Sequence, residues 1–387
     1  MRTWYKAFTY MNIVKQMPTS SDSNLKKIYV NDYRSPQAAV DYAKSIGGAR
    51  IIFLEGDYPC DLIINSPNIE LFSEGNTILR AKSSSSVIDV KAGGVNFVLD
   101  GFDVRGQTLR DELTSNRNGT KNNTRALHCI RIQERGARLR NFKTSGARYD
   151  GIYLKYDGKI DFEAQDFLFD STARNPVSIV AGQGFKFTRG KVRIDNNFSA
   201  GKGKLRSGTY LLDCEPNATS DRYRDIVFKE VIFENAGDRY GNNQVIFQDT
   251  NIGNANDLGV YFEDCEFIKS GIATGSAYVR LKANTKLKEF SNVHFKRTYH
   301  QNRAMAIASG GELLLKNSSF NDVVIDDKSL TFAIRLSTGT VVNNVRTTAD
   351  KSSSKSKAAA SSTSSNKPVN LLLDKKSNVK VMNVVGY

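Results

Sequence analysis

Two carboxylates separated by a single residue are the first candidates for chemistry. Asp213 and Glu215 lie in the segment LLDCEPN, and residues two apart on a β-strand face the same side. Glycoside hydrolysis uses two carboxyl groups, one as acid and the other as base or nucleophile. We therefore predict Asp213 and Glu215 as catalytic residues, with an acidic cluster at the ends of neighbouring strands formed by Asp150, Asp170 and Asp249.

Basic and aromatic side chains suggest a second kind of chemistry. A polysaccharide lyase needs a base beside a neutralised uronate, and His128, Arg131, Lys155 and Arg174 are the candidates for these roles. Strand alternation also predicts an outward row that would bind an extended glycan. These predicted substrate-binding residues are Arg131, Tyr153, Lys155, Arg174, Tyr210, Arg280 and Lys282. The alternative is a solvated surface in which the carboxylates cap turns.

The charge balance favours an anionic partner. Lys and Arg number 55 against 40 Asp and Glu, which gives a formal net charge of +15. Such an excess attracts polyanions, although a basic surface can also serve solubility alone. The sequence has no Asp-x-Asp-x-Asp loop and no phosphate-binding Gly-Lys loop, so we predict no metal and no cofactor. We expect no nucleic-acid partner, because no helix-turn-helix pattern is present.

The first residues and the hydropathy pattern bear on localisation. The segment 1–20 lacks the uninterrupted apolar stretch of a signal peptide, and no run long enough to span a membrane occurs elsewhere. We therefore expect no conventional secretion and no membrane insertion. Cys129, Cys214 and Cys265 lie in apolar, strand-like runs without metal-ligand spacing, which predicts reduced core residues.

The elements that would position these residues are short strands in a long repeat. Residues 35–48 have helical spacing and end on two glycines, which predicts a cap helix. From residue 49 the pattern changes to apolar bursts separated by Gly, Asn, Asp and Ser. Later bursts begin at positions 129, 152, 177, 209, 245, 278, 305, 333 and 370, so neighbouring starts are 23 to 37 residues apart. This spacing predicts a solenoid with loops of variable length, with an antiparallel sandwich as the alternative.

A recurring six-residue pattern predicts bends in each coil. The segments FKEVIF, FEDCEF, FSNVHF and LKNSSF begin and end with large apolar residues. Residues five apart on a straight strand face opposite sides, so both can point inward only if the chain turns between them. We place the turn at the third position, at Glu230, Asp264, Asn292 and Asn317, and expect Phe233, Phe267, Phe295 and Phe320 to form one internal column.

Composition divides the chain into segments. Residues 1–27 are polar and form a predicted N-terminal arm, whereas residues 28–387 form the predicted solenoid. Residues 350–367 are low-complexity and polar, which predicts a loop between two late coils, and a second long loop is expected at 106–126. Deleting residues 351–366 should leave the melting temperature nearly unchanged, because such a segment buries little apolar area.

Several segments resemble the pectate-lyase-like superfamily of right-handed parallel β-helices. The stretch SPQAAVDYAKSIGGARIIFLEGDY resembles its N-terminal cap helix and first coil. The segments DSTARNPVSIVAGQGFKF and GTYLLDCEPN resemble coils of its phage tail-spike and bacterial branches. The resemblance covers roughly residues 35–387 and implies an all-β, single-stranded right-handed parallel β-helix. It indicates the substrate weakly, because the superfamily includes lyases, hydrolases, epimerases and non-catalytic adhesins.

The resemblance implies a virion appendage of the tail-spike type. Such a protein would be a homotrimer that recognises an acidic polysaccharide of the host surface, with or without depolymerising it. The N-terminal arm would attach it to other virion proteins. Two alternatives stay open: a free polysaccharide lyase or glycoside hydrolase acting outside the cell, and a non-catalytic structural or adhesion protein.

Overall fold

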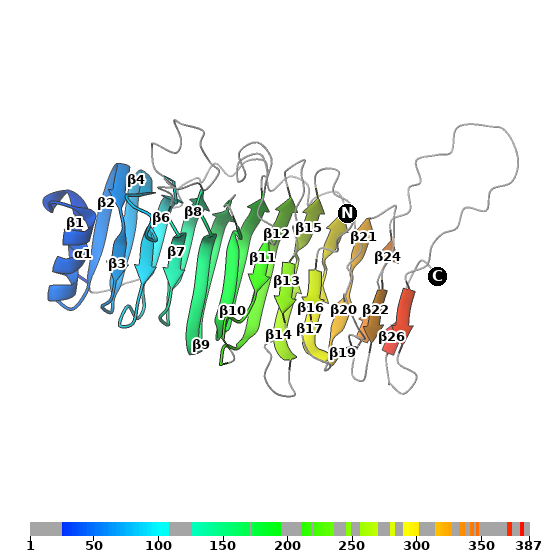
Figure 1. Cartoon of the computed structure of the whole chain (residues 1–387). Helices are drawn as coiled ribbons and strands as arrows, with labels where there is room; N and C mark the ends of the chain where they lie inside the picture. The colour runs from blue at the N-terminus through cyan, green and yellow to red at the C-terminus, as the bar shows by residue number, and fades with distance from the viewer. Residues whose placement is uncertain are drawn as a thin grey trace, which may run out of the picture.

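The protein is a right-handed parallel β-helix, as the sequence predicts, in which successive coils follow one another along one axis (Figure 1). All strand pairings are parallel and belong to one sheet. The computed structural model describes residues 25–107, 126–170, 172, 174–194, 210–218, 220–235, 245–248, 256–269, 279–282, 289–301, 314–326, 333–336, 341–343, 346–347, 370–373 and 380–382. The predicted loops at 106–126 and 350–367 and the arm at 1–27 lie almost wholly outside these residues.

The strands of the first coils include several long ones that pass through the bends of the coil. They are β1 (Lys27–Tyr29), β2 (Ala49–Cys60), β3 (Leu62–Ile64), β4 (Ile69–Ala81), β5 (Ile88–Val90), β6 (Val98–Arg105), β7 (His128–Ile132), β8 (Arg138–Ser145), β9 (Asp150–Phe169), β10 (Val177–Ile194), β11 (Leu212–Cys214) and β12 (Tyr223–Asn235).

The later coils are built from shorter strands. They are β13 (Val245–Gln248), β14 (Asn256–Glu263), β15 (Glu266–Lys269), β16 (Val279–Lys282), β17 (Glu289–Lys296), β18 (Tyr299–Gln301), β19 (Leu314–Lys316), β20 (Ser319–Asn321), β21 (Val324–Asp326), β22 (Ala333–Leu336), β23 (Val341–Asn343), β24 (Arg346–Thr347), β25 (Asn370–Leu373) and β26 (Lys380–Met382). The predicted strand starts at 177, 245, 333 and 370 coincide with observed ones, whereas the start at 305 lies outside the described residues.

A cap helix closes the N-terminal end of the stack (Figure 1). Helix α1 (Pro36–Ser45) follows a single turn of 3₁₀-helix, η2 (Val30–Asp32), and begins where the Ser35 hydroxyl accepts a hydrogen bond from the Ala38 amide. It ends at Ser45, and the chain then turns through Gly47 and Gly48, whose φ angles of 82° and 128° suit glycine. The helix is therefore confirmed, although it is shorter than the predicted range, and Ile46 is 40% exposed just beyond its end.

The predicted bends are confirmed at every position named. Glu230, Asp264, Asn292 and Asn317 have φ angles between 48° and 57°, in the left-handed region. Two bends therefore recur along the stack, and they divide each coil into short straight segments. In β9 the bends fall at Asp161 and Asp166.

Aromatic rings fill the interior, but in two columns rather than the single one predicted. Phe228, Phe262, Phe295 and Phe320 stack with ring centroids 5.0 to 5.3 Å apart. Phe233 and Phe267 belong to a neighbouring column that continues to His300, with centroids 5.1 and 4.5 Å apart. The prediction of one column was wrong because FKEVIF and FEDCEF span one bend, whereas FSNVHF and LKNSSF span the other.

The cysteines are core residues, as predicted. Cys60, Cys129, Cys214 and Cys265 are buried and free. Burial raises the pKa of Cys129 and Cys265 to about 12, so both stay protonated thiols at neutral pH. These residues contribute apolar volume to the interior.

Candidate functional site

The predicted site residues gather on one outward sheet surface, which we call the first face. It is formed by β3, β5, β7, the start of β9, the start of β10, β11, β13 and β16, paired in register. The alternation is confirmed, because Ile130, Ile152, Leu154, Val177 and Ile179 are buried. Between them runs one outward column: Ile63, Asp89, Arg131, Tyr153, Ser178 and Asp213. Ile246 and Arg280 occupy the next two positions of the same register.

A buried carboxylate anchors the middle of the first face. Asp150 has no exposed side-chain surface, and Arg174 Nε and Nη2 donate to its two oxygens at 2.7 and 2.6 Å. His128 Nδ1 lies 3.1 Å from Asp150 Oδ2. Burial would raise the pKa of Asp150, but the neighbouring His128 and Arg174 outweigh it and hold this pKa below its usual range. Asp150 is therefore an ionised anchor for Arg174.

Arg174 links this anchor to the predicted catalytic pair. Burial lowers the pKa of Arg174, but the charges of Asp150, Asp213 and Glu215 raise it overall. Its side chain is 34% exposed, and the guanidinium carbon lies 5.4 Å from the centroid of the Tyr149 ring. Arg174 can thus offer a fixed charge and free N–H groups to a ligand at the surface.

The two predicted catalytic carboxylates have different surroundings. Asp213 is 5% exposed and accepts a hydrogen bond from Asn175 Nδ2 at 2.9 Å. Glu215 is exposed, and its amide donates to the Ile179 carbonyl at 3.1 Å, which continues the strand pairing. The same Asn175 accepts from the Tyr210 amide at 2.8 Å, so it fixes the entry to β11. Glu215 is the carboxylate of the pair that a polysaccharide could reach.

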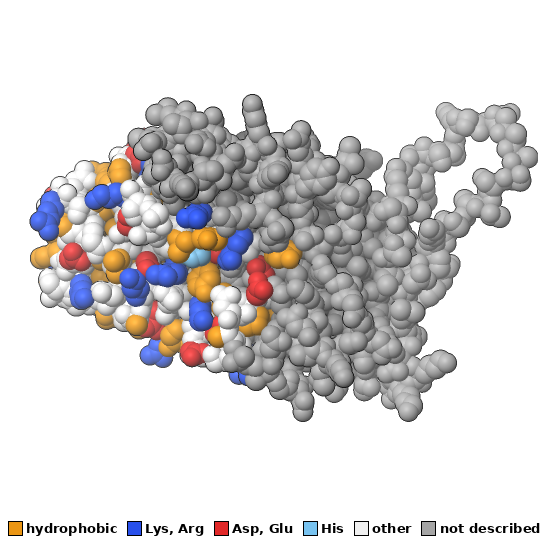
Figure 2. All heavy atoms as spheres, in the orientation of Figure 1, with side chains coloured by type: hydrophobic (Ala, Val, Ile, Leu, Met, Phe, Trp, Pro, Cys, Tyr) orange, Lys and Arg blue, Asp and Glu red, His pale blue; other side chains and the backbone are white. Residues whose placement is uncertain are grey.

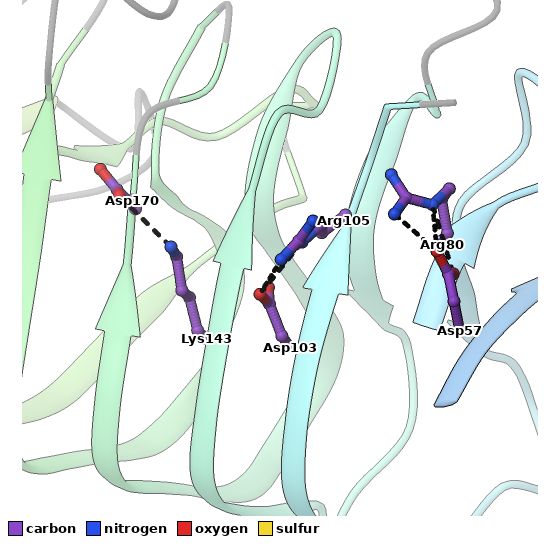
Figure 3. Close-up of polar contacts among 6 residues, drawn as sticks. All are labelled: Asp57, Arg80, Asp103, Arg105, Lys143 and Asp170. Atoms are coloured by element: carbon purple, nitrogen blue, oxygen red, sulfur yellow. Dashed lines mark hydrogen bonds and ion pairs between the residues drawn. The ribbon is translucent and has the colours of Figure 1, made fainter. Parts of the chain in front are cut away.

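The predicted cluster of Asp150, Asp170 and Asp249 does not form among the described residues. Asp150 begins β9, whereas Asp170 follows its last residue, beyond both bends. Asp170 lies 3.8 Å from Lys143 Nζ and 3.7 Å from Arg193 Nη1. Figure 3 shows the Lys143–Asp170 pair beside pairs from earlier coils. The prediction was wrong because β9 is a 20-residue strand that turns twice, and Asp249 lies outside the described residues.

The predicted basic residues of the first face are paired with acids. Arg131 makes a two-point ion pair with Asp89 of the preceding coil. Lys155 Nζ lies 3.1 Å from Asp221 Oδ2, which also accepts from the amides of Asn217 and Ala218 at 2.9 Å. The cations therefore alternate with carboxylates instead of forming a bare positive row. Arg280 and Lys282 lie on β16, where only their strand positions are described.

Aromatic rings lie beside the charged residues. The Tyr153 ring is tilted over His128, with centroids 4.9 Å apart, and the Tyr153 hydroxyl accepts from Asn217 Nδ2 at 3.3 Å. His128 is only 7% exposed beneath the Tyr153 ring. This burial argues against its predicted role as a base and suits a residue that supports Tyr153 and Asp150. Figure 2 shows this mixture of apolar, cationic and anionic side chains around a histidine.

Sequence reasoning missed the partners that hold the predicted residues in place. Asp89, Tyr149, Asn175, Asn217 and Asp221 were not singled out, yet each contacts a predicted residue or fixes its strand. Asp89 could have been found by aligning β5 with β7 in the repeat. Asp221 could not, because it reaches Lys155 from a turn 66 residues away.

The described residues include neither a metal-binding cluster nor a membrane-spanning helix. Among the described residues there is no group of three or more His, Cys, Asp or Glu side chains placed to hold a metal ion. Within that same part of the chain, no helix is long and apolar enough to cross a membrane.

Comparison with known proteins supports the fold assignment. No protein-family model and no curated protein matches the sequence. The solved structures that match include the tailspike protein gp49 of Acinetobacter baumannii bacteriophage Fri1, a capsular polysaccharide depolymerase, with a TM-score of 0.65 and 15% identity over 94% of this chain. The Dettilon tailspike protein gp208 matches with a TM-score of 0.51 and 11% identity over 83% of this chain.

The chain spans 62% of the length of gp49 and 66% of the length of the Dettilon tailspike. At these identities the likeness concerns the fold. The predicted right-handed parallel β-helix is thus confirmed as the fold.

Proposed function

We propose that the protein is a tail-spike-type virion appendage that recognises a polysaccharide of the host surface through the first face. The observation that carries this proposal is the cluster of Tyr149, Tyr153, Arg174 and Glu215 on three adjoining coils. Aromatic rings and fixed, partly exposed charged groups in one place suit the flat faces and hydroxyl groups of sugars. The fold shared with two tailspikes supports the same class of function.

An acidic polysaccharide is the favoured ligand within this proposal. The net charge of +15 attracts polyanions over several ångströms, beyond the paired residues of the first face. At the site, Arg174 keeps N–H groups available beyond the two that donate to Asp150. Long-range attraction would therefore bring the polymer in, and stacking and hydrogen bonds would set its position.

Depolymerisation is the second part of the proposal. Asp213 is buried and hydrogen-bonded, whereas Glu215 is exposed, and its charge helps to raise the pKa of Arg174. Two carboxyl groups in unlike environments are what acid–base cleavage of a glycosidic bond requires. Replacing both residues by their amides should abolish cleavage and keep binding, as measured by the release of reducing ends. Unchanged release would place any cleavage elsewhere.

Binding tests the main proposal directly. Purified surface polysaccharides from a panel of encapsulated bacteria are titrated against the parent and against Tyr153→Ala. We expect one or more polysaccharides to bind the parent, and the variant to bind at least about fivefold more weakly, because a sugar-stacking ring is lost. Ile63→Ala is the matched control, since Ile63 is 41% exposed in the same outward column and lies three coils earlier.

Two results would contradict the proposal. Equal affinities of the parent, Tyr153→Ala and Ile63→Ala would move recognition away from the first face. Failure of the parent to bind any polysaccharide in the panel would favour a structural protein. Finding the protein in purified phage particles by mass spectrometry, with its trimeric state measured in solution, separates a virion appendage from a free enzyme.

A further inference from the structure

A groove with a volume of about 570 Å³ lies at the bend that precedes a second sheet surface. It crosses five consecutive coils, those of β6, β8, β9, β10 and β12, and we call it the corner groove. Four steps of about 4.8 Å make it roughly 19 Å long in the direction of the helix axis. Its polar lining residues are Asn96, Arg135, Arg138, Asp161, Glu163, Lys186 and Asp225, and Val95, Phe162, Phe185 and Val227 line it as well.

The corner groove follows a bend at which glycines alternate with residues that have larger side chains. Asn96, Gly136, Asp161, Gly184 and Asp225 all have φ angles between 48° and 87° at this bend. A Cβ atom added at Gly184 would lie 3.6 Å from the Asp161 carboxylate, in ordinary van der Waals contact, whereas one added at Gly136 would meet Asn96 Oδ1 at 2.4 Å. The Asn96 side chain therefore packs over Gly136, and the coil of Gly184 is the more open of the two.

The charges of the corner groove are less tightly paired than those of the first face. Glu163 is shared between Arg138 and Lys186, both at 3.6 Å, and these two cations are 50% and 60% exposed. Arg135 is exposed and has no ion pair within the described part of the chain. Asp161 pairs with Lys159, and Asp225 accepts a hydrogen bond from Gln183. Guanidinium and ammonium groups are thus left with donors for a ligand.

An exposed aromatic ring continues the groove toward the later coils. Lys186, Val227, Tyr261 and His294 occupy one register column on successive coils. Tyr261 is 43% exposed, and its ring stacks on His294 with centroids 4.5 Å apart and planes 10° apart. The ring therefore lies about one coil spacing beyond Val227, held flat at the surface.

We propose that the corner groove, with Tyr261, is a second saccharide site that binds an extended acidic polysaccharide. Carboxylates and amides can accept from and donate to hydroxyl groups, Arg135 can pair with a uronate, and Tyr261 offers a face for a sugar ring. The inference rests on the proposed function, because it names a second contact of the same class of polymer. An acidic peptide would use the cations without the ring, which the experiment distinguishes.

The two sites lie on adjoining surfaces of the same coils. Strand β9 carries Tyr153 of the first face and, beyond the bend at Asp161, Glu163 of the corner groove. A long polymer that engages both sites gains affinity, because binding at one site raises its effective concentration at the other, whereas a fragment that fits one site gains none. Loss of the corner groove should therefore weaken the binding of long chains more than that of short ones.

The experiment compares long and short chains of a polysaccharide that binds the parent. We expect Lys186→Gln and Tyr261→Ala each to weaken binding of the long chain by about three- to tenfold, and fragments that fit the first face alone to lose less than about twofold. Lys229→Gln is the matched control, because Lys229 lies two residues beyond Val227 on β12, faces the same side and does not line the groove. Thermal melts confirm folding.

The possible outcomes of this experiment distinguish failure of the second site from failure of the proposed function. Equal binding of the long chain by Lys186→Gln, Tyr261→Ala and Lys229→Gln overturns the second site, while the first face stands if Tyr153→Ala still weakens binding. A loss in Lys186→Gln without a loss in Tyr261→Ala overturns the saccharide assignment in favour of an anionic peptide or another simple anion. Failure of the parent protein to bind any polysaccharide would contradict the proposed function itself.

Discussion

The interior aromatic column and the outward column of the first face pass through several of the same coils but repeat in different ways. Inside, Phe187, Phe228, Phe262, Phe295 and Phe320 stack one on another with centroids 4.7 to 5.3 Å apart. Outside, successive coils place Asp89, Arg131, Tyr153, Ser178 and Asp213 at equivalent positions. The interior requires the same shape at each coil, whereas the exterior allows a different chemical group at each.

This difference separates what maintains the fold from what is available for binding. Every inward ring depends on the rings above and below it, because close-packed interiors tolerate little change in volume. An outward side chain depends chiefly on its ion-pair partner, as Arg131 does on Asp89. Changes inside should therefore cost stability, and changes outside should mainly affect binding.

The largest effect is expected from removing one interior ring. Phe267→Ala should lower the free energy of unfolding by about 3 to 5 kcal/mol, because Phe267 is fully buried between Phe233 and His300. Chemical denaturation measures this loss, and Phe267→Leu should cost less because it leaves a smaller cavity. A loss below about 1 kcal/mol would show that the columns do not carry the stability of the fold.

A pH effect is expected from His300, which ends the same column. Burial lowers the pKa of His300 to about 3, whereas it is about 6.5 in an unfolded chain. The unfolded state therefore binds a proton first as pH falls, and stability should decrease from pH 6.5 toward pH 3, by about 2 to 4 kcal/mol from this group.

Replacing the imidazole by a ring that does not titrate should reduce this loss. We expect His300→Phe combined with Thr298→Val to flatten the fall in stability over that pH range. The second substitution is needed because Thr298 Oγ1 hydrogen-bonds His300 Nε2 at 3.1 Å and would lose its partner, whereas valine needs none. Urea denaturation at several pH values measures how the free energy of unfolding changes with pH. His294→Phe is the control with a smaller effect, since His294 is half-buried. An unchanged pH profile in the double variant would contradict a buried neutral imidazole.

A smaller effect is expected from the anchor beneath the first face. Asp150→Asn should destabilise the protein by about 1 to 3 kcal/mol, because it leaves Arg174 without its two charged hydrogen bonds. Asp170→Asn is the matched control at the other end of β9, where ion pairs of 3.7 and 3.8 Å to cations that are 33% and 34% exposed should contribute less than about 1 kcal/mol. Equal losses in the two variants would remove the distinction between anchor and surface pair.

The smallest effect on stability is expected from neutralising two cations that are predicted to face outward. Lys155→Gln combined with Arg280→Gln should weaken the binding of an acidic polysaccharide and reduce the dependence of this binding on salt. The free energy of unfolding should change by about 1 kcal/mol or less. Asp221 keeps two backbone donors when Lys155 is lost, so its burial stays compensated. Titrations at low and at about 0.5 M salt measure the effect. Affinity that does not change with salt in either protein would contradict an acidic ligand.

The sequence predicted the fold well because the interior pattern is local and repeated. The apolar pairs five residues apart marked the bends at Glu230, Asp264, Asn292 and Asn317 without any structure. The arrangement of rings was not predictable to the same degree, because the pattern does not state which of two bends it spans. This is why Phe267 stacks on His300 and not on Phe295.

The candidate site was predictable only in part, because its contacts cross coils and loops. Alternation correctly directed Arg131, Tyr153 and Lys155 outward. It could not show that each cation has a carboxylate partner, since the loop between two coils varies in length and moves residues such as Asp221 far along the sequence. Charge counted along a sequence therefore overstates the charge that a surface presents.

The most direct test of polysaccharide recognition is a hydrogen–deuterium exchange footprint of a bound polysaccharide on the protein. We expect slower amide exchange at residues 149–155, 174–178 and 210–217 of the first face, and, with long chains, also at 135–138 and 184–186 of the corner groove. Glu215→Gln should keep this footprint even if cleavage stops. Protection confined to other surfaces, with the first face exchanging at its unbound rate while the polysaccharide is bound, would contradict the account.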